Sequence, residues 1–167
     1  MSKKGKLLFK YGTMSSGKSL HLLATAHHFQ EHSIPFLILK SEIDTRDGKG
    51  VIHSRAIGDR ECVTISTTDN IYGIVSDFLD TRHYSNFEVF KWILVDEAQF
   101  LTKKQVEELC AIADNFGISI ICYGLRTDFK TNLFEGSKRL FGHREDKLLL
   151  LGRILRPAGY RSRVSVH

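Results

Sequence analysis

Short apolar runs alternate with amphipathic segments through the first 125 residues of the chain. Runs that are too short for helices predict buried strands at residues 6–11, 36–39, 92–97 and 118–123, with a shorter strand at 63–65. Helices are expected between them, at residues 18–30, 71–79 and 103–116. Because strands alternate with helices, the pattern predicts an α/β fold in which helices cover both faces of a parallel sheet.

The predicted helices carry signals at their ends. The first has apolar residues at three- and four-residue spacing, which predicts its buried face: Leu22, Leu23, Ala26 and Phe29. Asn70 is suited to capping the second helix. Thr102 and Gln105 have the spacing of a capping box before the third, and Gly117 is suited to ending it. Four histidines lie in or just after the first helix and lack acidic or cysteine partners at metal spacing, so we expect them at the surface: His21, His27, His28 and His32.

A phosphate-binding motif joins the first strand to the first helix. Residues Gly12-Thr13-Met14-Ser15-Ser16-Gly17-Lys18-Ser19 fit the pattern G-x-x-x-x-G-K-[ST] at every fixed position. In this motif glycines let backbone N–H groups turn towards an anion, and the helix adds the positive end of its dipole. Lys18 would reach the β- and γ-phosphates and Ser19 would ligate Mg²⁺. The chain is therefore expected to bind a nucleoside triphosphate within a P-loop, RecA-like sheet.

A second motif lies where the strand at 92–97 ends. Asp96 and Glu97 follow four apolar residues, which is the Walker B pattern, and there the aspartate holds Mg²⁺ beside the phosphates. Such a pair is common as a helix cap, but behind a phosphate loop it indicates catalysis. Polar segments at 41–62 and 124–129 also follow predicted strands, and ligands gather at that edge of α/β sheets. By spacing alone, Arg46 and Arg55 fit a phosphate role and a solvated loop equally well, whereas Arg60 fits the loop.

Charge and cysteine content change this picture little. The net charge of +5 comes from the end of the chain, since residues 138–167 hold eight Lys or Arg against two acidic residues. A basic tail of this kind is more often a solvated end than a nucleic-acid contact, so we expect no nucleic-acid partner. Cys62, Cys110 and Cys122 lack C-x-x-C spacing and fit reduced thiols in a cytoplasmic protein. Neither a signal peptide nor a membrane-spanning run is expected.

Taken together, the motifs resemble the thymidine kinases of the cytosolic and bacterial type. The segments that carry the resemblance are residues 12–19, Asp44-Thr45-Arg46, Ser54-Arg55, Asp96-Glu97-Ala98-Gln99-Phe100, Gly124-Leu125-Arg126-Thr127-Asp128-Phe129 and Phe134-Glu135-Gly136-Ser137. Their order and spacing cover roughly residues 5–140. The resemblance implies transfer of the ATP γ-phosphate to the 5′-hydroxyl of thymidine, in a homotetramer.

The resemblance also implies a role for each matching residue. Glu97 would be the general base, while Arg46 and Arg55 would offset charge on the transferring group. Lys18, Gln99 and the loop amides would hold ATP, with Ser19 and Asp96 on Mg²⁺. The base pocket would be formed by Met14, Phe100, Leu125, Phe129 and Phe134, although plain core packing also fits these five.

The end of the sequence departs from the family. The family continues with a zinc-binding lobe built on two cysteine pairs, whereas no cysteine follows Cys122 here. We therefore expect a kinase domain at residues 1–140, a divergent basic tail at 141–167, no zinc, and weakened activity.

Two other classes of function stay open at this stage. The segment Asp96-Glu97-Ala98-Gln99 superficially matches the acidic box of helicases, which suggests a nucleic-acid-stimulated ATPase. Helicase action usually needs a second motor domain, for which 167 residues leave no room. A non-catalytic nucleotide-binding protein is the other alternative.

Overall fold

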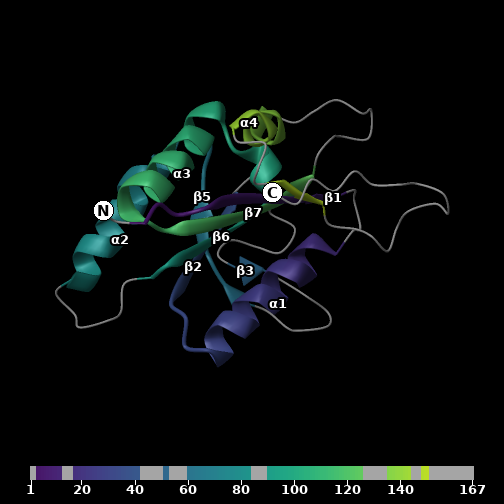
Figure 1. Ribbon diagram of the computed structural model, residues 1–167. Coiled ribbons are helices and arrows are strands. Elements are labelled where there is room, and N and C mark those ends of the chain that lie inside the picture. Colours follow the sequence, from purple (N-terminus) through teal and green to yellow (C-terminus); the bar gives the residue numbers. More distant parts are fainter. Residues whose placement is uncertain are drawn as a thin grey trace.

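A six-stranded parallel sheet forms the centre of the molecule (Figure 1). The computed structural model describes residues 3–12, 17–41, 51–52, 60–83, 90–125, 135–143 and 148–150. The sheet has the order β5-β2-β6-β7-β1-β8, and every neighbouring pair is parallel. Its strands are β1 (Leu7–Gly12), β2 (Phe36–Ser41), β5 (Val63–Ile65), β6 (Trp92–Asp96), β7 (Ser119–Leu125) and β8 (Leu148–Leu150). Two further strands, β3 (Val51–Ile52) and β4 (Arg60–Glu61), form a separate antiparallel pair.

Helices cover both faces of this sheet, which confirms the predicted α/β architecture. Helix α1 (Lys18–Glu31) lies on one face, and α2 (Ile71–His83), α3 (Lys103–Phe116) and α4 (Glu135–His143) lie on the other (Figure 1). A short 3₁₀ helix, η1 (Ala98–Phe100), follows β6 and contacts α4 and β7. All four histidines of the α1 region are exposed, as expected.

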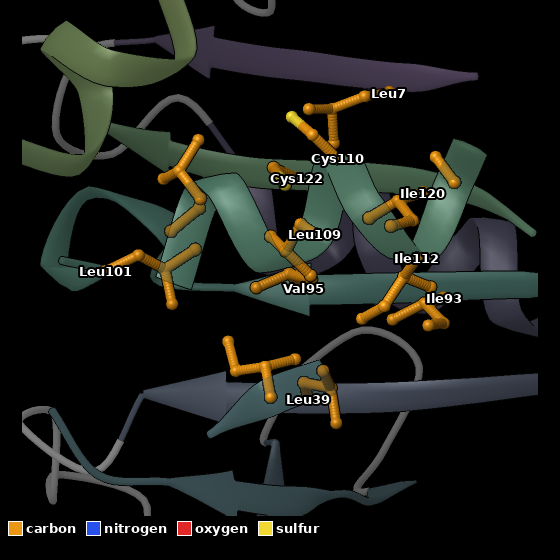
Figure 2. Packing of buried hydrophobic residues seen from close by; sticks show 14 of the residues in the cluster. Leu7, Leu39, Ile93, Val95, Leu101, Leu109, Cys110, Ile112, Ile120 and Cys122 are labelled. Atoms are coloured by element: carbon orange, nitrogen blue, oxygen red, sulfur yellow. The ribbon is translucent and has the colours of Figure 1, made fainter. Parts of the chain in front are cut away.

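Two hydrophobic clusters fill the spaces between the layers, because successive side chains of a buried strand point to opposite faces. In β6, Leu94 packs in the α1 cluster, whereas Ile93 and Val95 belong to the cluster beneath α2 and α3. Figure 2 shows Leu109 and Ile112 of α3 above Ile93 and Val95. Both faces of β6 are therefore covered, which explains why residues 92–95 form an unbroken apolar run in the sequence.

The predicted helix signals are confirmed. The Thr102 hydroxyl accepts from the Gln105 N–H at 3.1 Å while the Gln105 side chain accepts from the Thr102 N–H, so the capping box is complete. Asn70 Oδ1 accepts from the Gly73 N–H at 3.0 Å at the start of α2. Gly117 ends α3 with a φ of 67°.

Most of the predicted elements have bounds that differ from the prediction, by one to four residues. Strand β2 continues to Ser41 and α2 continues to His83. Strand β8 was not predicted, because a run of leucines fits a helix or a strand until its neighbour is known, and that neighbour is β1. Within the described part of the chain, no helix combines the length and hydropathy that a bilayer crossing requires.

Candidate active site

The carboxyl ends of β1, β6 and β7 meet at one edge of the sheet. Gly12, the last residue of β1, is the register partner of Leu125, the last residue of β7. Asp96, the last residue of β6, is the register partner of Lys40 in β2. Parallel strands therefore bring the two sequence motifs to the same edge, which is where α/β sheets bind ligands.

The described part of the phosphate loop has the expected geometry. Gly17 has a φ of 75° and a ψ of 28°, a left-handed conformation that glycine adopts without steric cost. The Gly17 carbonyl accepts the first hydrogen bond of α1, from the His21 N–H at 2.9 Å. Lys18 and Ser19 lie in the first turn, which contains no acidic residue. An anion would therefore meet the positive end of the helix without a carboxylate in that first turn.

Lys10 adds basic character to β1, two residues before Gly12. Its Nζ lies 5.7 Å from the centroid of the Tyr123 ring, on the strand between β1 and β6. Burial lowers the pKa of Lys10. Partial burial, and then the charge of Lys10, lowers the pKa of His21, the fourth residue of α1.

Two buried carboxylates lie at the end of β6. Asp96 is 3% exposed and Glu97 is 9% exposed. The Glu97 N–H donates to Asp96 Oδ1 at 3.0 Å. Glu97 has a φ of 53° and a ψ of 41°, a left-handed conformation that costs a residue with a Cβ about 1–2 kcal/mol. Strain of this kind in a non-glycine residue is typical of functional sites.

Gln99 connects Glu97 to the end of β7. Its Nε2 donates to Glu97 Oε2, and its Oε1 accepts from the Leu125 N–H at 3.1 Å. The side chain of Gln99 is 2% exposed. On the other side of the same peptide segment, the Ser137 hydroxyl donates to the Leu125 carbonyl. The site is thereby connected to α4.

A glycine makes room for this connection. A Cβ on Gly124 would lie 2.8 Å from Gln99 Oε1, 3.0 Å from the Gln99 backbone nitrogen and 3.3 Å from the Phe9 ring. These distances are shorter than van der Waals contact, so residue 124 is glycine because Gln99 lies against the backbone of β7.

The structure places part of the predicted site. Glu97, Gln99 and Leu125 are joined by hydrogen bonds, Asp96 adjoins them, and Phe100 lies half-buried on η1. The sequence assigns Gln99 to the nucleotide site, whereas its described hydrogen bonds are to Glu97 and Leu125. The following predicted residues lie outside the described residues: Thr13, Met14, Ser15, Ser16, Arg46, Arg55, Phe129 and Phe134.

Sequence reasoning missed Lys40 as part of this edge. Its side chain is 2% exposed, and its Nζ donates to the Val51 carbonyl at 3.2 Å. The available signal was the position of Lys40 directly after the apolar run of a buried strand. A lysine there is expected to be buried, and lysines are rarely buried without partners.

The oxygen donors present suit Mg²⁺ rather than a soft metal. Asp96 supplies a buried carboxylate and Ser19 a hydroxyl, and Mg²⁺ prefers such ligands together with phosphate oxygens. Among the described residues, no group of three or more His, Cys, Asp or Glu side chains could hold a metal ion. The three cysteines are free thiols, as expected.

Comparison with known proteins identifies the family. The family model described as thymidine kinase matches residues 5–162. A thymidine kinase of Streptococcus pyogenes serotype M3 is 39% identical over 135 residues, which are 81% of this chain and 67% of that protein. A thymidine kinase of Rhodopirellula baltica is 44% identical over 135 residues, which are 81% of this chain and 61% of that protein. The motifs, the sheet and these matches agree, and the chain belongs to the thymidine kinase family.

Proposed function

We propose that this chain transfers the γ-phosphate of ATP to the 5′-hydroxyl of thymidine. The observation that carries the proposal is the pair of buried carboxylates at the end of β6, on the sheet edge where the phosphate loop begins. One carboxylate is enough to hold Mg²⁺, so the second is available for the proton of an incoming alcohol. Family membership supplies the nucleoside as the source of that alcohol.

ATP is bound at the start of α1 in this proposal. The N–H groups of the first turn and Lys18 contact the phosphate oxygens, as they do in phosphate loops generally. Ser19 and Asp96 hold Mg²⁺, which when bound neutralises charge on the β- and γ-phosphates. Gly12 and Gly17 allow the backbone to approach the phosphates, with Thr13, Met14, Ser15 and Ser16 between them.

Glu97 acts as the general base. The 5′-oxygen forms a bond to the γ-phosphorus, the bond from that phosphorus to the β–γ bridging oxygen breaks, and ADP leaves. The 5′-hydroxyl proton passes to the Glu97 carboxylate. Arg46 and Arg55 stabilise the charge on the transferring group.

The thymine ring lies among five apolar residues, which we propose from the family motifs: Met14, Phe100, Leu125, Phe129 and Phe134. Of these, Phe100 directly follows Gln99 in the chain, and the Leu125 N–H donates a hydrogen bond to the Gln99 side chain. The closeness of these two residues to the proposed base supports a nucleoside oriented with its 5′-hydroxyl towards Glu97.

The quaternary and cellular context is also proposed. A homotetramer in the cytoplasm is suggested by the family resemblance, and three free thiols fit a reducing compartment.

The division at residue 140 and the replacement of a zinc lobe by residues 141–167 stay predictions. The family match runs to residue 162, and β8 joins part of this region to the sheet. Metal analysis of the purified protein tests the zinc prediction, since about one zinc per chain would contradict it.

One assay separates the candidate functions. ADP release from Mg·ATP is measured with thymidine, with other nucleosides and with single-stranded DNA. Release that requires thymidine supports the proposal, and release that requires DNA supports a motor instead. Binding of Mg·ATP without release under any condition supports a non-catalytic nucleotide-binding protein.

A further inference from the structure

The Gln99 side chain spans the gap between two strand ends. Its amide nitrogen donates to Glu97 Oε2 at the end of β6, and its amide oxygen accepts from the Leu125 N–H at the end of β7, at 3.1 Å. When the oxygen and the nitrogen of one planar amide are both hydrogen-bonded, the amide restrains the distance between its two partners. One oxygen of Glu97 is therefore tied to the backbone of a neighbouring strand.

The end of this connection at Leu125 is itself held on both sides. The Leu125 N–H donates to Gln99, and the Leu125 carbonyl accepts from the Ser137 hydroxyl of α4. The Gln99 amide oxygen also lies against Gly124, where a Cβ would come within 2.8 Å of Gln99 Oε1. The anchor is thus an interior strand of the sheet, hydrogen-bonded to β6 on one side and to β1 on the other.

The backbone at Glu97 needs such an anchor. Its left-handed conformation persists only where surrounding contacts determine it. The Glu97 N–H donates to Asp96 at 3.0 Å and the Glu97 carbonyl accepts from the Phe100 N–H at 3.1 Å, so the main chain is fixed on both sides. The hydrogen bond from Gln99 adds a contact to the Glu97 side chain.

We propose that Gln99 is a positioning residue, which aims the Glu97 carboxylate by anchoring one of its oxygens to β7. This inference rests on the proposed function of Glu97 as the base. A base must lie within hydrogen-bond reach of the proton that it takes, and a displacement of about 1 Å can cost about 10²-fold in rate. Gln99 thus acts through Glu97 on the rate of transfer.

Gln105 provides a matched control. It is also 2% exposed, and its Nε2 donates to the carbonyls of Ser66 at 2.8 Å and Asp69 at 3.1 Å. Like Gln99, it joins two segments through a buried amide, since its oxygen accepts from the Thr102 N–H, but none of its partners is a carboxylate. Gln105→Leu therefore measures the general cost of losing a buried glutamine.

The test measures kcat and KM for both substrates, together with thermal stability. Gln99→Leu should lower kcat by about 10²-fold and change KM for Mg·ATP by less than about threefold. Gln105→Leu should lower stability yet keep kcat, measured well below its melting temperature. In a Glu97→Gln background, Gln99→Leu should lower kcat by less than about threefold further, because its effect passes through Glu97. A kcat of Gln99→Leu equal to that of the parent, or a full 10²-fold loss in both backgrounds, overturns the proposal.

A second variant and a crystal structure keep the inference testable if Gln99→Leu does not fold or if the parent proves not to be a kinase. Gln99→Glu keeps an acceptor for the Leu125 N–H and removes the donor to Glu97. A crystal structure of either folded variant should show the Glu97 carboxylate displaced. Glu97 in its original rotamer and left-handed conformation overturns the positioning role whatever the activity, whereas loss of thymidine-dependent turnover in the parent contradicts only the proposed function.

Discussion

Lys40 and Asp96 are register partners at the carboxyl ends of two adjacent parallel strands, and both side chains are buried. The Lys40 Nζ donates to the Val51 carbonyl at 3.2 Å. The two charges also act on the same neighbour: burial raises the pKa of Cys62 to about 11, the charge of Lys40 opposes that rise, and the charge of Asp96 adds to it. A buried cation thus accompanies the buried carboxylate that we propose for Mg²⁺.

Lys40→Met should destabilise the protein by about 3–5 kcal/mol, because a buried carboxylate loses a nearby opposite charge. Urea unfolding at neutral pH measures the change. In an Asp96→Asn background the same substitution should cost clearly less, since no anion is then left behind. Equal losses in the two backgrounds would show that Lys40 acts through packing and its hydrogen bond alone.

Glu97→Gln should reduce thymidine phosphorylation by about 10²–10⁴-fold while Mg·ATP binds nearly as before, because a general base acts in the transition state. Steady-state kinetics and titration calorimetry measure the two quantities. Glu107→Gln is a suitable control, since that glutamate lies on α3 and pairs with Arg139 at 2.9 Å. If Glu97→Gln turns over at the parental rate, Glu97 is not the base.

Lys18→Ala should remove most of the protection that Mg·ATP gives against thermal unfolding. A ligand at about 100 times its Kd stabilises the folded state by about 2.7 kcal/mol, and a weaker complex gives less. Lys104→Ala, an exposed lysine in the first turn of α3, should keep the full protection. Equal protection in all three proteins would place the triphosphate elsewhere.

Gly124→Ala should lower both stability and kcat. Its Cβ would lie 2.8 Å from Gln99 Oε1, so either the strand or the glutamine must shift, at a cost of about 1–3 kcal/mol. Gly73→Ala in α2 is the matched control, because the nearest atom to its Cβ would be 3.4 Å away on the Asn70 side chain. That control should gain about 0.5–1 kcal/mol, as expected for a helical glycine. A Gly124→Ala variant with parental kcat would contradict the tight contact with Gln99.

Tyr123 should make stability fall at alkaline pH. Burial raises the pKa of Tyr123 to about 12, the hydrogen bond with Thr25 at 3.0 Å opposes the rise, and the charges of Cys122 and Asp96 add to it. A group whose pKa is raised on folding stabilises fully below its unfolded value of about 10. This contribution, up to about 2–3 kcal/mol, is lost as the pH rises from about 10 to about 12.

The difference in unfolding free energy between the parent and Tyr123→Phe isolates this effect from other alkaline titrations. The difference should be constant up to about pH 10 and should then shift against the parent towards pH 12. The difference in tyrosinate absorbance between the folded parent and Tyr123→Phe should show that Tyr123 ionises late. A difference that stays constant across this range would contradict the effect of burial.

The local elements could largely be predicted from the sequence. Helix α3 follows from Thr102, Gln105 and Gly117, since caps and C-terminal glycines act within a few residues of the chain. The short strand β5 and the buried face of α1 were also predicted correctly. Both depend on side-chain periodicity, which the linear order of residues contains directly.

Pairing between distant segments could not be predicted in this way. Strand β8 exists because three leucines lie beside β1, and nothing near Leu148–Leu150 identifies that neighbour. The order of the strands, with β7 between β1 and β6, is likewise a property of the whole sheet. Lys40 follows an apolar run in the sequence, and its burial depends on β6 and on Val51.

The sequence by itself determined the chemistry available to this protein: a phosphate loop, a carboxylate pair behind an apolar strand, and the family to which the chain belongs. These features are short and contiguous, so each can be read from a few neighbouring residues. Only the tertiary structure decided how Glu97 is held, through a left-handed backbone and a glutamine anchored to β7. Such an arrangement depends on distances between segments that are far apart in the chain, and local propensity does not specify those distances.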